Sequence, residues 1–160
     1  MRLLQNGESF PKLEIPAVGG GTLVLPDAVR GSFGVILVYR GAWCPFCTAQ
    51  LGGFAAEKAA LDALGVKVVA LSVDNELMTS ELVAKFSLNF PLGHSADVAR
   101  VSEATGAFMN DSPKYLQPTA FTLTPEGTVM AAVYSTQAIG RLVAPDLIRF
   151  VSFMKSRLAA

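Results

Sequence analysis

The two cysteines of this 160-residue chain, Cys44 and Cys47, are the residues best suited to do chemistry. They lie in the segment Trp43-Cys44-Pro45-Phe46-Cys47, after an apolar run and before a helical pattern. At this spacing two side chains at the start of a helix share one face, with Cβ atoms about 5 to 6 Å apart, which allows a disulfide. Unpaired N–H groups and the helix dipole also favour a thiolate there. The sequence therefore predicts a dithiol that cycles between reduced and oxidised forms.

Other uses of a Cys-x-x-Cys pair fit this chain less well. A closed zinc site needs four ligands, but the chain has no second cysteine pair and a single histidine, His94. Covalent haem attachment needs a histidine after the second cysteine, where Thr48 stands. A purely structural disulfide would stabilise little, because so short a loop removes little entropy from the unfolded chain. We therefore predict no metal and no bound cofactor.

Three residues near the pair are candidates to assist it. Arg40 lies four residues before Cys44, where its guanidinium would stabilise a thiolate or orient a substrate oxygen; the alternative is a solvated arginine at a strand end. Trp43 and Phe46 are large apolar side chains that either form a docking surface for a partner or cover the core. His94 has no sequence link to the dithiol, and we expect no essential role for it.

The surrounding elements must hold these residues, and their order predicts an α/β fold. Hydrophobic periodicity predicts strands over residues 10–15, 22–25, 33–39, 66–73, 119–123 and 128–134, and helices over residues 45–64, 76–86, 97–105 and 146–158. The glycines at 19–21 predict the turn of an N-terminal hairpin. Alternation of strand and helix in the middle of the chain predicts parallel strands with right-handed crossovers. The dithiol, with Pro45 in the first helical turn, then lies at the carboxyl edge of the sheet.

Composition narrows the class of protein. About half of the residues are hydrophobic, which suits one compact domain over residues 1–160. Thirteen basic residues balance thirteen acidic ones without clusters, so we expect neither nucleic acid nor a membrane surface as a partner. The charged, glycine-containing N-terminus does not fit a signal peptide, and we expect a cytoplasmic protein. Stable disulfides are uncommon in that compartment, so the pair is expected to cycle.

The motif order resembles the thioredoxin fold over nearly the whole chain, with Trp-Cys-Pro-Phe-Cys between strand and helix and Gln117-Pro118-Thr119 before a hairpin. The N-terminal hairpin, the segment 90–92 and the turn 123–127 are similar to the peroxiredoxin-like branch, the alkyl hydroperoxide reductase and thiol-specific antioxidant family. Residues 39–47 resemble its dithiol variant. The resemblance implies a central mixed sheet flanked by helices, with an N-terminal hairpin extension.

The thioredoxin resemblance implies roles for five residues. Cys44 would attack a substrate disulfide, and Cys47 would resolve the mixed disulfide. Pro118 would be a cis proline facing the dithiol, with Gln117 and Thr119 beside it pairing with an extended substrate. One feature is missing, since the position of the buried acid of thioredoxins holds Val38.

The peroxiredoxin resemblance implies the opposite roles. Its motif P-x-x-x-T-x-x-C places the peroxide-attacking cysteine at Cys47, with Cys44 in the position of the threonine and Arg40 in that of the proline. The catalytic arginine of that family aligns with Pro118. These departures weaken a standard peroxidase mechanism, because the threonine and arginine position the peroxide and stabilise the developing charge.

The leading prediction is therefore a thiol-disulfide oxidoreductase in which Cys44 is the nucleophile and a thioredoxin or glutathione system supplies the reducing thiols. The alternative is a thiol peroxidase that reduces hydroperoxides, with Cys47 oxidised to sulfenic acid and Cys44 condensing with it. A third reading is a redox-inert binding module that uses Trp43 and Phe46. The resemblance also leaves a homodimer open.

Overall fold

A mixed five-stranded sheet forms the centre of the computed structural model, which describes residues 2–159. Its strands are β3 (Phe33–Val38), β4 (Val66–Leu71), β5 (Leu92–Gly93), β8 (Thr119–Leu123) and β9 (Val129–Tyr134), in the spatial order β5-β4-β3-β8-β9. Strands β4 and β5 run parallel to β3, whereas β8 is antiparallel to β3 and β9 to β8. The predicted mixed sheet is confirmed.

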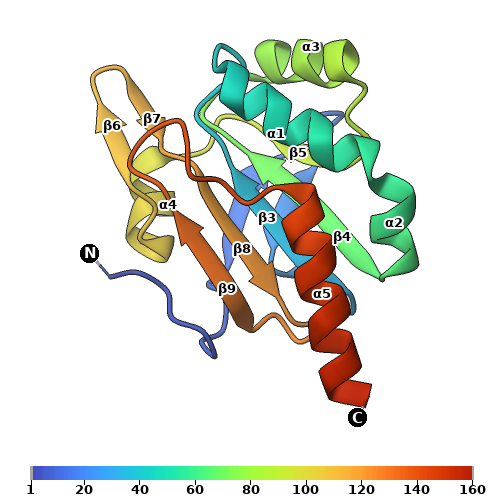
Figure 1. Ribbon diagram of the computed structural model, residues 1–160. Helices are drawn as coiled ribbons and strands as arrows, with labels where there is room; N and C mark the ends of the chain where they lie inside the picture. The colour runs from blue at the N-terminus through green and yellow to red at the C-terminus, as the bar shows by residue number, and fades with distance from the viewer. Residues whose placement is uncertain (1, 160) are drawn as a thin grey trace.

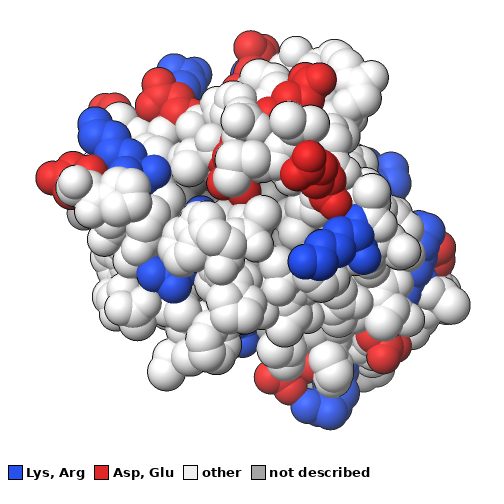
Figure 2. All heavy atoms as spheres, turned by 90° about the horizontal axis from the view of Figure 1, so that it is seen from above, with Lys and Arg blue, Asp and Glu red and all other residues white. Residues whose placement is uncertain are grey.

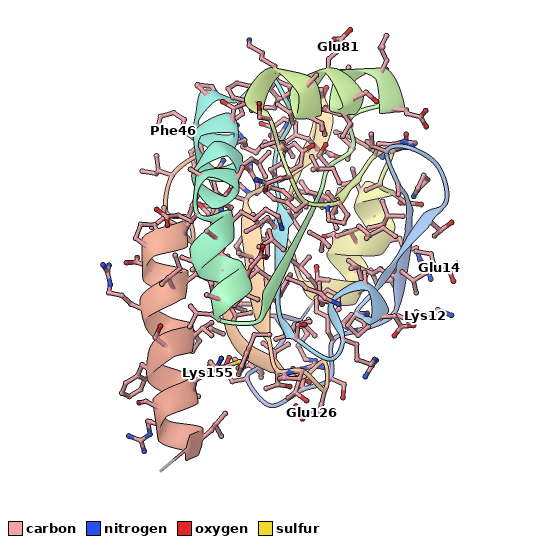
Figure 3. The ribbon with its side chains drawn as sticks, turned by 90° about the vertical axis from the view of Figure 1, so that its right-hand side faces the viewer. Lys12, Glu14, Phe46, Glu81, Glu126 and Lys155 are labelled. Atoms are coloured by element: carbon pink, nitrogen blue, oxygen red, sulfur yellow. The ribbon has the colours of Figure 1, made fainter. Side chains whose placement is uncertain are left out.

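The central strand β3 is buried on both faces, and its side chains alternate between two cores. Val35 and Leu37 belong to one cluster, and Ile36 and Val38 belong to the other. The first cluster is covered by α1 (Pro45–Ala56), α2 (Lys58–Ala63), α3 (Glu76–Phe86) and α5 (Ala144–Ala159). The second is covered by the hairpin of β1 (Leu13–Pro16) and β2 (Thr22–Leu25), with the 3₁₀ turn Asp27–Val29 and α4 (Val98–Thr105). Figures 1 and 3 show α1 and α5 on one side of the sheet, with α4 and the N-terminal hairpin on the other.

The helix predicted over residues 45–64 is divided in two. Glu57 leaves the helical region, with φ −100° and ψ 18°, and separates α1 from α2. Side-chain caps and a turn glycine set the ends of the later helices. The Asn75 side chain accepts the Met78 N–H at the start of α3, and Gly106, at φ 83°, ends α4.

One hairpin was not predicted from the sequence, and it borders the dithiol. Strands β6 (Met109–Asp111) and β7 (Lys114–Leu116) pair with each other and form their own two-stranded sheet. Each has only three residues, too few for a periodic signal. Within residues 2–159, no helix is long and apolar enough to cross a membrane.

Candidate active site

The dithiol lies where β3 leaves the sheet and α1 begins, as the sequence predicts. Cys44 is the N-cap of α1, and its Sγ accepts the Cys47 N–H at 3.3 Å. Pro45 follows in the first helical turn, where its missing N–H costs nothing. Both cysteines are free thiols, with exposed fractions of only 1% for Cys44 and 0% for Cys47. The reactive sulfurs are therefore buried beneath other groups.

The group nearest to the sulfurs is the guanidinium of Arg141, which the sequence analysis did not select. Its Nη2 lies 2.9 Å from Cys47 Sγ and 3.7 Å from Cys44 Sγ. Arg141 comes from the loop between β9 and α5, more than ninety positions after the cysteines. No local motif marks it, because only the packing of that loop against α1 brings it to the dithiol.

A short network fixes the Arg141 side chain. Its Nη1 donates to Gln50 Oε1 at 2.7 Å, and its Nε donates to the carbonyl of Ala138. Gln50 is buried on α1 and donates through Nε2 to the carbonyl of Leu142 at 2.8 Å, so it holds the loop at Arg141 and at the next residue. The Ser135 hydroxyl donates to carbonyls within the same loop. The guanidinium is thus held in place before any substrate arrives.

Arg40 is the second arginine that contacts both cysteines. Its main-chain N–H donates to Cys47 Sγ at 3.3 Å, and its Nη1 lies 4.0 Å from Cys44 Sγ. Its Nη2 donates to the hydroxyl of Tyr115 at 2.9 Å, and the guanidinium lies over the rings of Trp43 and Tyr115, at 4.8 and 5.1 Å from their centroids. The hairpin of β6 and β7 therefore supplies the residue that orients Arg40.

The two thiols ionise as a coupled pair. Burial raises the pKa of both, but for Cys44 the hydrogen bonds from Cys47 and the charges of Arg141 and Arg40 outweigh burial and lower its pKa. The pKa of Cys47 is raised, first by burial and then by its hydrogen bond to Cys44, although Arg40 and Arg141 oppose this. The pair thus loses its first proton more easily than a free cysteine and holds its second more tightly.

Two apolar side chains adjacent to the cysteines in the sequence are exposed at the surface. Trp43 and Phe46 are 53% and 52% exposed, and Trp43 packs edge-on against Tyr115 with ring centroids 5.1 Å apart. Phe46 projects outward from the first turn of α1 (Figure 3) and lines a groove of about 340 Å³ with Ile139, Val143 and Arg141. Figure 2 shows this end of the molecule with an uncharged area between scattered charged side chains.

Comparison with known proteins agrees with this geometry. The model of the AhpC/TSA family matches residues 6–132. The chain belongs to the AhpC/TSA family. Curated relatives include a peroxiredoxin of Methanothermobacter thermautotrophicus, 27% identical over 151 residues that cover 91% of this chain and 70% of the relative. A peroxiredoxin of Nanoarchaeum equitans is 24% identical over 155 residues, which cover 94% and 69% of the two chains.

Solved structures show that this AhpC/TSA chain has the thioredoxin-like fold that the sequence predicts. AhpC of Mycobacterium tuberculosis superimposes with a TM-score of 0.81 at 18% identity, covering 98% of this chain and 96% of that one. Peroxiredoxin 6 of Arenicola marina gives 0.81 at 20% identity, covering 95% and 74%. Together with the paired thiols, family membership makes the protein a thiol-based redox enzyme.

The predicted substrate-docking segment of this AhpC/TSA protein needs correction. The two cis peptide bonds of residues 2–159 precede Pro26 and Pro113, so the bond before Pro118 is trans and the cis prediction is wrong. The chain passes extended from β7 into β8 without a reversal, and an extended X-Pro segment favours the trans form. Gln117, Pro118 and Thr119 are all buried, which does not suit pairing with a peptide.

An arginine lies at the dithiol although Pro118 occupies the position that aligns with the family's arginine. Arg141 reaches the sulfurs from the loop after β9. The sequence comparison failed here because it assigned the role by position along the chain. A charge near a thiolate requires only proximity in space.

His94, the single histidine, makes its contacts away from the cysteines. Its Nε2 lies 3.0 Å from Glu76 Oε2, and its Nδ1 lies 2.9 Å from the hydroxyl oxygen of Ser95. Both partners belong to segments that follow β4 and β5. Within the described part of the chain, the histidine serves the packing of these segments and contacts neither sulfur.

A buried acid stands next to the dithiol loop, although Val38 occupies the thioredoxin position. Asp74 lies beyond the end of β4 and is 6% exposed, and its Oδ2 accepts the Ala42 N–H at 2.7 Å. This contact holds the loop two residues before Cys44. Burial raises the pKa of the Asp74 carboxyl, and the hydrogen bond from Ala42 opposes that shift.

Removing this carboxyl should destabilise the protein. We expect Asp74→Ala to lower the free energy of unfolding by about 1 to 3 kcal/mol, because the Ala42 N–H loses its acceptor. Asp74→Asn keeps an acceptor oxygen and is the matched control.

The pH dependence of stability gives a second measure of this carboxyl. Since the folded-state pKa of Asp74 is raised, native stability falls as pH rises through that pKa, and the Asn variant should lack this fall. Urea unfolding at pH 4 and pH 7 measures both effects, and equal stability of the Ala and Asn variants would contradict the role of Asp74.

Proposed function

We propose that this AhpC/TSA protein is a thiol peroxidase that reduces hydroperoxides, with Cys47 as the peroxidatic cysteine and Cys44 as the resolving cysteine. This assignment is the reverse of the leading sequence prediction, in which Cys44 attacks and Cys47 resolves. The observation that carries the proposal is the burial of both sulfurs, at 1% and 0% exposure, beneath the side chain of Arg141. A hydroperoxide is small enough to reach sulfurs buried to this extent, which favours it as the substrate of the reduced dithiol.

The donors favour Cys47 as the attacking sulfur. Arg141 Nη2 at 2.9 Å and the Arg40 N–H at 3.3 Å both point at Cys47 Sγ. Because the pKa of Cys44 is lowered and that of Cys47 is raised, the Cys47 thiolate is the minor form of the singly ionised pair. It forms when the Cys44 thiolate accepts the Cys47 proton, and its sulfur then has the closer guanidinium. Charge-assisted donors at this distance stabilise a thiolate and the charge that develops in attack.

The reaction follows from these positions. The Cys47 thiolate attacks the terminal oxygen of the hydroperoxide; an S–O bond forms, the O–O bond breaks, and the alkoxide takes a proton and leaves as an alcohol. The resulting sulfenic acid condenses with the Cys44 thiol, which forms the disulfide and releases water. Cys44 needs no large movement, because both sulfurs already lie within 3.7 Å of one Arg141 nitrogen. An external dithiol of the thioredoxin type then reduces the disulfide by exchange.

Relatives support this choice of substrate and reductant. The curated relatives described above are named peroxiredoxins, which fits a hydroperoxide as substrate. Exchange chemistry is retained in the reductive half of the cycle, where the Cys44–Cys47 disulfide reacts with a thiol. The exposed Trp43 and Phe46 rings flank that disulfide and offer a contact area for the reductant. A homodimer is compatible with the same surface.

The proposal is tested by comparing two substrates of the reduced protein. Stopped-flow measurement should give a rate constant of about 10⁴ M⁻¹s⁻¹ or more for hydrogen peroxide or tert-butyl hydroperoxide, within the normal range of enzymes. Reduction of a folded protein disulfide should be far slower under the same conditions. Peroxide consumption no faster than that of free cysteine, with rapid reduction of the protein disulfide, would overturn the proposal in favour of an exchange enzyme.

A further inference from the structure

Among residues 2–159, three buried side-chain polar atoms have no hydrogen-bond partner: the hydroxyl oxygen of Tyr39, the donor Nε of Arg40 and the acceptor Oε1 of Gln117. The latter two come from the segments that follow β3 and β7. Gln117 is only 7% exposed, so solvent does not satisfy its amide oxygen. An unpaired buried polar group costs about 1 to 3 kcal/mol, and native proteins contain few of them. A donor and an acceptor left unpaired in one region point to a ligand that bonds to both.

The backbone places these two side chains on the same side of the sheet edge. Val38 pairs with Thr119 at the end of the β3–β8 ladder, so continuing that antiparallel register sets Arg40 opposite Gln117. Gln117 also continues the β6–β7 ladder, since its N–H donates to the carbonyl of Phe108 at 2.7 Å. Side chains two residues apart on an extended strand lie on the same face, so those of Gln117 and Tyr115 point in the same direction. The Tyr115 hydroxyl accepts a hydrogen bond from the Arg40 guanidinium.

The same place adjoins both sulfurs. Arg40 contacts Cys47 Sγ through its main-chain N–H and approaches Cys44 Sγ to 4.0 Å through Nη1. Arg141 also lies at the sulfurs, so two guanidinium groups approach the dithiol. A ligand held by Arg40 and Gln117 is therefore next to the reacting atoms.

We propose that Arg40 Nε and Gln117 Oε1 form an oxygen subsite that binds the O–O–H group of a hydroperoxide. This rests on the peroxidase function proposed above and assigns the binding partners of its substrate. The amide oxygen accepts the hydroperoxide O–H, and the guanidinium N–H donates to the oxygen that leaves. The pair thus adds a second donor to that of Arg141 and supplies an acceptor in place of the threonine that Cys44 replaces.

The subsite also selects a chemical class. When the Cys47 thiolate takes the terminal oxygen, negative charge develops on the other oxygen, and the Arg40 N–H stabilises it until a proton converts it to the alcohol. The O–H of the substrate satisfies Gln117 Oε1 throughout. A dialkyl peroxide or an ether has no O–H and would leave that acceptor buried and unpaired, so the site should reject both.

Binding is tested first on the reduced protein of native sequence, without any reaction. The ¹⁵N–¹H resonance of Arg40 Nε should shift in a saturable manner when tert-butyl alcohol, the product of tert-butyl hydroperoxide, is added. Methyl tert-butyl ether, of similar shape but without a hydroxyl donor, should cause little shift. Equal shifts with both compounds, or none with either, would overturn the subsite whether or not the protein reduces peroxides.

Kinetics then separate the subsite from the peroxidase function. Gln117→Met should slow tert-butyl hydroperoxide reduction about tenfold, the loss of one neutral hydrogen bond, while iodoacetamide still alkylates the thiolate within about twofold of the parent rate. Gln5→Met, on the exposed N-terminal segment, is the matched control. Unchanged peroxide kinetics in Gln117→Met would contradict the subsite. Alcohol binding at Arg40 without rapid peroxide reduction would support the subsite and contradict the peroxidase function instead.

Discussion

Cys47→Ser should lose rapid peroxide reduction, with a rate constant at least about 10³-fold lower, while Cys44→Ser should keep a single rapid turnover. The reason is the distribution of donors. Arg141 and the Arg40 N–H both point at Cys47 Sγ, so a lone Cys47 thiolate keeps its two stabilising contacts. A lone Cys44 keeps the main-chain N–H of residue 47 at 3.3 Å, but its contacts to the two guanidinium groups are longer, at 3.7 and 4.0 Å.

The two cysteine variants also leave different products. Cys44→Ser should accumulate sulfenic acid at Cys47, because no resolving thiol remains, and mass spectrometry with a sulfenic-acid probe detects it. Both serine substitutions keep nearly the same side-chain size, so thermal unfolding serves as the control for folding. If Cys47→Ser instead trapped a mixed disulfide through Cys44 and retained its reaction rate, Cys44 would be the nucleophile and the assignment would be reversed.

Arg141→Met should lower the rate constant for peroxide reduction by about 10² to 10³-fold, as expected for removal of a preorganised donor at the site of developing charge. Arg141 is the closest cation to either sulfur, and Gln50 and Ala138 hold it there. Arg149→Met is the matched control, since Arg149 is exposed on α5 and forms an ion pair with Asp146. Comparable losses in the two variants would contradict a specific role for Arg141.

The pH dependence of the Arg141 variant tests the electrostatic part of that role. The positive charge favours the thiolate and thereby helps to lower the pKa of Cys44. Without the charge this pKa should rise, so the rate should reach its plateau at a higher pH and the loss should be largest near neutrality. Thiolate absorbance near 240 nm, followed against pH, reports the shift directly. An unchanged titration curve would mean that Arg141 acts on the peroxide alone.

The sequence by itself was sufficient to predict the fold and the reactive pair. Strands buried on both faces and helices with one apolar face have periodic patterns, and these placed β3, β4, α3 and β8 within two residues of their observed bounds. The dithiol could be found in the same way, because its chemistry depends on a spacing of three residues and on the helix start, both local properties. Family resemblance added the thioredoxin-like arrangement.

The surroundings of the dithiol were decided only by the tertiary structure. Arg141, Gln50 and Tyr115 come from three elements and carry no sequence signal for a shared site, while Pro118, which resemblance had marked, has a trans bond and is buried. The choice between attacking cysteines depends on which sulfur a distant guanidinium reaches. Electrostatic stabilisation acts through distance in space, and a local pattern holds no information about contacts between residues separated by ninety positions.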